Sequence, residues 1–282
     1  MIIDTHTHFY DPTRPQGVPW PSPDDKLLYR TVLPDDYKEL AVPEGVTGTV
    51  MVEASFCLED NKWILDLANQ DPFILGVVGN IVPNRDEFSA ELERFSSDPF
   101  FRGIRCRNRY FEDVKSGSFL SDMEILSEKD LVLDVIIHRK DLDGLLVLAE
   151  CIPKLRIVVD HIAHMPIDGN PIDHTWIEEY RRIAEFPQIC MKVSALMEQS
   201  VVQPAPVDVD FYRPTLDALL DIFGKDRIIY GSNWPVCERS GDFSNGINIV
   251  KTYFKEKGEE IFNKYFWKNA KTVYRLIERL AS

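Results

Sequence analysis

The sequence predicts an α/β fold, a single-domain (β/α)8 TIM barrel over residues 1–282 with parallel strands inside and helices outside. The first observation behind this prediction is that short runs rich in Val and Ile alternate with longer segments of helical pattern. The second is that eight such runs occur, each followed by a helix or by enough chain to form one. The third is the length of 282 residues, which leaves room for a few long loops around a barrel of roughly 250 residues.

The eight predicted strands are mostly apolar throughout, as strands buried on both faces of a parallel sheet should be. An open, doubly wound sheet is the alternative, and it is disfavoured because no GxGxxG fingerprint follows the first strand. The predicted strands are Ile2–His6, Gly48–Ser55, Ile74–Ile81, Phe101–Arg107, Leu131–His138, Leu155–His161, Ile189–Ala195 and Arg227–Asn233.

Three segments between the strands show the apolar stripe of an amphipathic helix. One stripe contains Trp176, Tyr180 and Ile183, and Gly224 follows the last of the three segments as a C-terminal cap. The segments are Asp86–Phe95, His174–Phe186 and Tyr212–Phe223. Two loops are long, namely the proline-rich Asp11–Asp36 and Glu198–Asp210. Both follow strands, so we expect them to overhang the catalytic end of the barrel as substrate lids.

The composition is consistent with a cytoplasmic enzyme that acts on small molecules. A formal charge of −14 argues against nucleic acid or anionic membranes as partners, because both reward clustered Lys and Arg. No apolar run reaches the ~20 residues of a membrane helix, and Asp4 and His6 stand where a signal peptide needs a basic and then an apolar region. The five cysteines are scattered without a CxxC pair, so we expect reduced thiols rather than disulfides or a cysteine-based zinc site.

Polar side chains stand where the predicted strands end, which is where barrel enzymes carry their working residues. Four of the six histidines fall at such ends, and a scatter of surface histidines would not do so. The polar residues at strand ends are His6, His8, Glu53, Ser55, Arg105, Arg107, His138, His161, Lys192 and Asn233.

The histidines are the first candidates for chemistry. His6 and His8 lie two residues apart, so they share one face of the first strand. We interpret them as a metal-binding or polar catalytic pair, the alternative being two incidental histidines on a solvated strand end. His161 is interpreted as a ligand, hydrogen-bond donor or base, and alternatively as a buried structural histidine. The candidate metal ligands are therefore His6, His8 and His161, with His164 a weaker candidate, while His174 begins a helix as a surface or capping residue.

The cationic side chains indicate the class of substrate. Arg105 and Arg107 share one strand face, and a guanidinium matches a carboxylate or a developing oxyanion. We expect an anionic or polyhydroxylated small molecule, the alternative being ion pairs with loop carboxylates. Lys192 is unfavourable to bury unpaired, so it either contacts the substrate or pairs with a buried acid such as Glu53. His138 is either a substrate contact or structural.

Six blocks of the chain resemble a known family. The blocks are THTH, FRGIRCR, IVVDHIAHMP, MKVSAL, RIIYGSNWPVC and NAKTVYRL. They are similar to the amidohydrolase superfamily, and more narrowly to its amidohydrolase-related branch containing sugar lactonases and 2-pyrone-4,6-dicarboxylate lactonase. The resemblance extends from Ile2 to about Leu276, and GSNWPVC is its most specific part. It implies hydrolysis of a lactone or a related ester-like bond, with His6, His8 and His161 polarising the carbonyl and Arg105 holding the substrate.

The chain departs from that family at Asn233. The block that contains it normally ends in an acidic residue that activates water, and Asn cannot accept a proton at neutral pH. Either Asn233 only positions the water while His161, His164 or Glu53 takes the proton, or the protein is a weak or altered catalyst. We also expect the next residue, Trp234, to contact the substrate.

The resemblance leaves the need for a metal evenly balanced. A divalent ion, zinc in the first place, needs only three protein ligands and would polarise the carbonyl and lower the pKa of bound water. Members of this branch that resemble this sequence can work without a metal, and the three histidines and Arg105 would then stabilise the oxyanion directly.

Three hypotheses for the function follow. The leading one is a hydrolase that opens a sugar-acid lactone, an aldonolactone, in carbohydrate catabolism by attack of water on the carbonyl. The second is a metal-dependent decarboxylase of an aromatic or unsaturated acid on the same fold. The third is a catalytically impaired barrel that binds a small acid or sugar.

Overall fold

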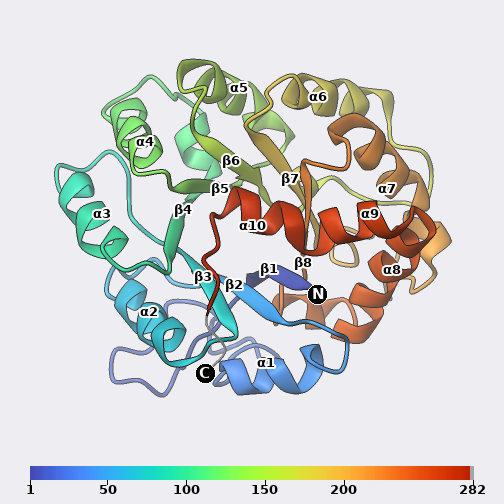
Figure 1. Ribbon diagram of the computed structural model, residues 1–282, viewed down its shortest axis with the longest axis horizontal. Helices are drawn as coiled ribbons and strands as arrows, with labels where there is room; N and C mark the ends of the chain where they lie inside the picture. The colour runs from blue at the N-terminus through green and yellow to red at the C-terminus, as the bar shows by residue number, and fades with distance from the viewer. Residues whose placement is uncertain (280–282) are drawn as a thin grey trace.

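The computed structural model describes residues 1–279 and contains an eight-stranded sheet in the order β1 to β8, with every neighbouring pair parallel. Helices surround this sheet (Figure 1). The strands are β1 (Ile3–Thr7), β2 (Gly48–Val52), β3 (Ile74–Gly79), β4 (Phe101–Arg107), β5 (Val132–Ile136), β6 (Arg156–Val159), β7 (Ile189–Ser194) and β8 (Ile228–Gly231).

The sheet closes between β1 and the chain that leaves β8. The amide of Asn233 donates to the carbonyl of His6 at 2.9 Å, and the amide of His8 donates to the carbonyl of Trp234 at 2.9 Å. Because these bonds join the first and last strands, the predicted barrel is confirmed and the open sheet is not observed.

The helices form an outer ring, and those of the C-terminal region cross one end of the barrel (Figure 1). The predicted α3, α6 and α7 are present, and Gly224 ends α7 with a φ of 68°. α7 begins at Val209 rather than Tyr212, because the Asp208 carboxylate caps it by accepting a hydrogen bond from the amide of Asp210. The helices are α1 (Pro34–Ala41), α2 (Asp60–Gln70), α3 (Phe88–Ser96), α4 (Phe119–Glu128), α5 (Leu142–Cys151), α6 (His174–Ala184), α7 (Val209–Phe223), α8 (Phe243–Glu256), α9 (Glu259–Asn263) and α10 (Asn269–Val273). Within residues 1–279, none of the helices combines the length and the apolar character that crossing a membrane requires.

The barrel interior has an apolar floor with charged groups above it. The floor is a buried cluster made of Ile3, Val50, Val52, Val78, Val132, Val158 and Ile229, together with Ala270, Val273 and Tyr274 of the C-terminal region. Above this floor the interior becomes charged. Asp134 of β5, Lys192 of β7 and Asp160, which directly follows β6, are buried there. The functional groups therefore rest on a closed core rather than on an open pore.

Both long loops contact the end of the barrel at which the strands finish. In the loop of residues 11–36, the Trp20 ring lies 5.9 Å from the His8 ring and 5.6 Å from the Tyr10 ring. In the loop of residues 198–210, Glu198 accepts a hydrogen bond from Asn233. The two loops therefore contact the ends of the strands, as the sequence analysis predicted.

Candidate active site

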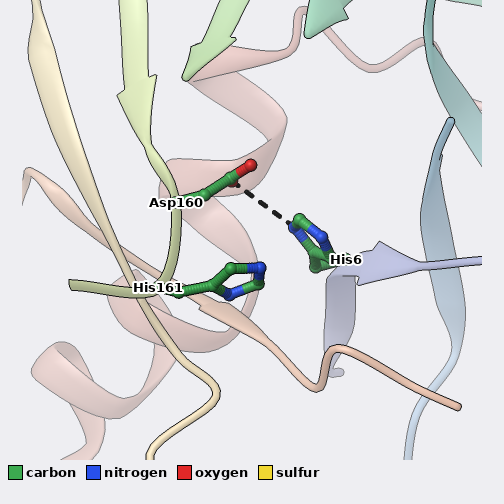
Figure 2. A group of neighbouring side chains, drawn as sticks. All are labelled: His6, Asp160 and His161. Atoms are coloured by element: carbon green, nitrogen blue, oxygen red, sulfur yellow. Dashed lines mark ion pairs between the residues drawn. The ribbon is translucent and has the colours of Figure 1, made fainter. Parts of the chain in front are cut away.

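The chain leaves β6 through a left-handed turn that shapes the site. His161, Ile162, Ala163 and His164 have φ values of 50° to 58°, a conformation that is less stable for an L-residue by roughly 1–2 kcal/mol. The turn is supported by Tyr180 of α6, whose hydroxyl donates to the Ile162 carbonyl at 2.8 Å. A regular strand would point consecutive side chains to opposite faces. Here Asp160 and His161 both face His6 of β1 (Figure 2).

The three strand-end histidines form one cluster, which we call the histidine cluster (His6, His8 and His161). The ring centroids of His6 and His161 are 4.3 Å apart, and those of His6 and His8 are 4.9 Å apart. All three side chains are buried, with His6 at 0% exposure. The fold therefore brings together the three histidines that the sequence analysis grouped.

A hydrogen bond assigns the ring proton of His8, whereas His6 lies among charged groups. The carbonyl of Val52 only accepts, so Nδ1 of His8 donates to it at 2.9 Å and Nε2 carries the lone pair. Both ring nitrogens of His6 face donors, because Nε2 lies 3.4 Å from Nη1 of Arg105 and Nδ1 lies 3.2 Å from the Lys192 ammonium. Nδ1 of His6 also lies 3.4 Å from Oδ1 of Asp160.

His161 follows the same pattern as His8. The Ser194 hydroxyl donates to the carbonyl of Lys192 at 3.4 Å, so it accepts from Nδ1 of His161 at 2.8 Å. His8 and His161 therefore each donate from Nδ1 to a protein partner and keep the Nε2 lone pair. Metal-binding histidines are held in this way, with the second nitrogen donating to a carboxylate, carbonyl or hydroxyl.

The histidine cluster is neutral at neutral pH. Burial, with Arg105 adding to it, lowers the pKa of His8 to about 3. Burial also holds the pKa of His6 and of His161 well below the usual 6.5, and the Lys192 charge acts in the same direction. The neutral rings of His8 and His161 can bind a cation or accept from a hydroxyl through Nε2, so donors to a developing anion must come from other side chains.

Beneath the histidine cluster lies a buried group of charges. The Lys192 ammonium is 2.7 Å from Oδ2 of Asp134 and 2.8 Å from Oδ1 of Asp160, and all three side chains are fully buried. Burial opposes ionisation of Asp160, yet Lys192 and His6 hold its pKa well below the usual range. Of the two roles expected for Lys192, pairing with buried acid is the one observed, although the acids are not Glu53.

Glu53 instead binds the two arginines of β4. Its Oε1 accepts from Nε of Arg105 at 2.9 Å and from Nη2 of Arg107 at 3.1 Å. Arg105 is buried against His6, whereas 47% of the Arg107 side chain is exposed. Both arginines therefore form ion pairs, which was the alternative to a substrate contact, although the partner is the strand-end Glu53 rather than a loop carboxylate. Arg107 also remains accessible to a ligand.

Glu198 is a residue of this site that the sequence analysis missed. Its Oε1 accepts from Nδ2 of Asn233 at 3.0 Å, and burial raises its pKa to about 7. The available signal was an acidic residue just after β7, in a loop expected to overhang the barrel. That signal is weak, because nothing in its spacing distinguishes Glu198 from a solvated loop carboxylate.

The remaining predicted residues, His138, Trp234 and His174, lie outside the histidine cluster. His138 is exposed after β5, and its ring stacks at 4.7 Å on that of His164. Trp234 is only 1% exposed, because its ring packs at 5.1 Å on Tyr37 of α1. The expected substrate contact needs an exposed ring, so the structure does not support it for Trp234. His174 is exposed at the start of α6, as expected.

His6, Asp160 and His161 can hold a divalent metal, since each offers a ligand atom and these atoms all lie within 4.8 Å of one another (Figure 2). Two nitrogens and one oxygen suit an ion such as zinc. Neither Asp160 oxygen has a well-aligned hydrogen bond, which fits an oxygen ligand, although the Lys192 ammonium competes for it. Asp160 thus takes the place expected for His8, which lies outside this close group.

Comparisons with known proteins identify the family and agree with the barrel fold. A family model described as amidohydrolase matches residues 3–276. An L-fucono-1,5-lactonase of Burkholderia ambifaria is 30% identical over 249 residues, which cover 86% of this chain and 83% of that protein. An amidohydrolase from Burkholderia multivorans, 22% identical, covers 98% of this chain and 100% of its own, with TM-scores of 0.88 in a crystal form with bound HEPES and 0.86 in one with bound Zn. A probable 2-pyrone-4,6-dicarboxylic acid hydrolase from Acinetobacter baumannii, with citric acid bound, has a TM-score of 0.77 at 16% identity, covering 98% of this chain and 99% of its own.

Proposed function

Because this chain belongs to the amidohydrolase family, we propose that it opens a sugar-acid lactone by attack of water on the lactone carbonyl. The observation that carries the proposal is the convergence of the neutral histidine cluster and the Arg105 guanidinium at one end of the barrel. The 30%-identical relative is named L-fucono-1,5-lactonase, which supports an aldonolactone as substrate.

Arg105 is the donor best placed for the charge that develops on the carbonyl oxygen. It is 7% exposed and held by Glu53 at 2.9 Å, so it is oriented before the substrate arrives. A fixed donor in a site that excludes water stabilises an oxyanion far better than a mobile one, and removing one such donor typically lowers kcat by 10²–10³. The lactone carbonyl is therefore proposed to lie beside Arg105 and His6.

The other groups are suited to a hydroxylated substrate. The Nε2 lone pairs of His8 and His161 can accept from sugar hydroxyls, and Arg107 can donate to them from the rim. A divalent ion held by His6, Asp160 and His161 would polarise the carbonyl and lower the pKa of bound water. Zinc is the ion we propose, on the chemistry of these ligands and its presence in the Burkholderia multivorans structure.

The proposal is tested by assaying purified protein against five- and six-membered aldonolactones, L-fucono-1,5-lactone included, through proton release with a pH indicator. We expect at least one lactone to be hydrolysed, and Arg105→Met to lower kcat/KM by about 10²–10³. Arg109→Met is the control, because among the described residues 1–279 the Arg109 side chain donates to Tyr110 at 2.7 Å and to no other residue, so the change should leave the rate unchanged. If the protein hydrolyses none of these lactones, the proposal is overturned.

The same assay tests the ion. We expect a chelator to lower kcat and zinc to restore it, with one equivalent of metal found by elemental analysis. An unchanged kcat in protein shown to be metal-free would contradict the role of the ion and leave carbonyl polarisation to Arg105.

A further inference from the structure

Hydrolysis requires a group that accepts a proton from the attacking water, and Asn233 at the end of β8 cannot do so. A base works best when its pKa is near the working pH and when it can reach the proton. The ionisable groups around the histidine cluster can be compared on these two requirements.

The other carboxylates of the site are already paired with cations. Glu53 is 3% exposed and bound by Arg105 and Arg107. Asp134 and Asp160 are fully buried and share the Lys192 ammonium. Because each carboxylate is held by a fixed positive charge and is shielded from solvent, none is suited to collect a proton from water.

The histidines are also unsuited as bases. His6 and His161 are the proposed ligands of the divalent ion, and Nδ1 of His8 donates to the Val52 carbonyl at 2.9 Å. Burial and the neighbouring His138 lower the pKa of His164, so its ring resists taking up a proton at neutral pH.

Glu198 differs from all of these groups in its partner and its exposure. Its carboxylate is partly exposed, and its hydrogen-bond donor is the neutral amide of Asn233 at 3.0 Å. Asn233 in turn is joined to the histidine cluster, because its backbone amide donates to the His6 carbonyl at 2.9 Å. Within residues 1–279, Glu198 is thus a carboxylate that forms no ion pair and that contacts Asn233 at the end of β8.

The surroundings of Glu198 favour titration near neutral pH. Burial raises its pKa to about 7. Tyr212 of α7 and Cys237 in the turn after β8 lie close enough that the Glu198 carboxylate raises the pKa of each. Burial raises the pKa of Tyr212 to about 12 and that of Cys237 well above its usual value, so both stay neutral while Glu198 titrates.

We propose that Glu198 is the catalytic base of this enzyme, held at the site by Asn233, an assignment that rests on the lactone hydrolysis proposed above. The Glu198 carboxylate takes one proton from water while the water oxygen bonds to the carbonyl carbon and the π electrons move to the carbonyl oxygen. When the tetrahedral intermediate collapses, the bond to the ring oxygen breaks, and that oxygen takes the proton back from Glu198. The product is the open hydroxy acid, and Glu198 is again a carboxylate.

The first test is Glu198→Gln, which keeps the shape of the side chain and removes its basicity. We expect kcat to fall by about 10²–10⁴, the usual contribution of a general base. In the wild-type enzyme kcat/KM should rise with pH around a midpoint near 7, because only the ionised Glu198 accepts a proton. The control is Glu238→Gln, a nearby carboxyl that accepts from Trp234 at 2.9 Å, which should leave kcat and the pH profile unchanged.

The second test exchanges the two side chains in a Glu198→Gln, Asn233→Asp double variant. The new pair can keep its hydrogen bond, with Gln donating to Asp, while the carboxylate moves to the β8 position. We expect kcat to recover to within about tenfold of wild type, with the pH midpoint shifted below 7. A merely structural Glu198 would give no such recovery.

The outcomes separate the two proposals. Wild-type activity in Glu198→Gln, or no recovery in the double variant, would overturn the assignment of Glu198 while leaving lactone hydrolysis intact. A wild-type enzyme that hydrolyses no lactone would overturn both.

Discussion

Lys192 is the residue on which the buried charge of the barrel depends. Its ammonium is the positive partner of Asp134 and Asp160, and none of the three side chains has exposed surface. Removing one member of a buried ion pair leaves an uncompensated charge, which typically destabilises a protein by about 3–5 kcal/mol. Pairs nearer the surface contribute about 1 kcal/mol or less.

Lys192→Met is therefore expected to lower the free energy of unfolding by about 3–5 kcal/mol in urea denaturation. Lys251→Met is the matched control, because the Lys251–Glu44 pair has side chains 17% and 19% exposed and should change stability by about 1 kcal/mol or less. Equal losses in the two variants would contradict the argument that burial makes Lys192 special.

At the scale of elements, the junction of β8 with β1 determines where His6 lies. Gly231 faces His6 across this junction, and a Cβ at Gly231 would lie 2.8 Å from Cβ of His6 and 3.3 Å from Cδ of Lys192. Carbon atoms cannot approach so closely, so any larger residue must displace His6. Because Gly231 has no side chain, His6 can lie close to β8, and this contributes to the position of the histidine cluster.

Gly231→Ala is expected to destabilise the protein by about 1–3 kcal/mol, the usual effect of overpacking a core, and to lower kcat because His6 moves. Gly246→Ala is the control, since a Cβ there lies 3.7 Å from Sδ of Met197 and Ala favours a helix interior by roughly 0.5–1 kcal/mol. Thermal unfolding and the lactone assay measure both effects. A Gly231→Ala variant with wild-type kcat would show that His6 tolerates the shift.

At the scale of the whole molecule, the C-terminal region connects the floor of the barrel to the charges under the site. α10 packs its apolar side chains on the floor cluster. The next residue, Tyr274, donates from its hydroxyl to Oδ2 of Asp134 at 2.9 Å. The end of the chain therefore helps to hold the carboxylate that binds Lys192, which in turn lies 3.2 Å from Nδ1 of His6.

Tyr274→Phe is expected to lower the free energy of unfolding by about 1.5–3 kcal/mol, because the hydroxyl binds a charged acceptor. Tyr265→Phe is the comparison, since its buried hydroxyl donates to the neutral carbonyl of Val193 at 2.8 Å and should contribute about 0.5–1.5 kcal/mol. Urea denaturation of both variants measures the difference, and a larger loss in Tyr265→Phe would contradict it.

The sequence by itself determined the barrel, the family and the strand ends that carry polar groups. These follow from patterns between neighbours in the chain, namely apolar runs, helical stripes and blocks such as GSNWPVC. Such patterns survive without knowledge of the fold, because each depends on residues only a few positions apart. The grouping of His6, His8 and His161 followed from the rule that parallel strands end on one side of a barrel.

Only the tertiary structure decided which atoms meet within that grouping. The positive φ of His161 turned its ring to the side that Asp160 faces, and no local pattern specifies that turn. Lys192 pairs with Asp134 and Asp160 rather than with Glu53, and Asn233 donates to Glu198. These partners lie far apart in the chain, so the pairing is set by distances across the barrel and not by any local sequence pattern. Burial then set which groups are charged, since the loss of water around a side chain is a property of the packed molecule.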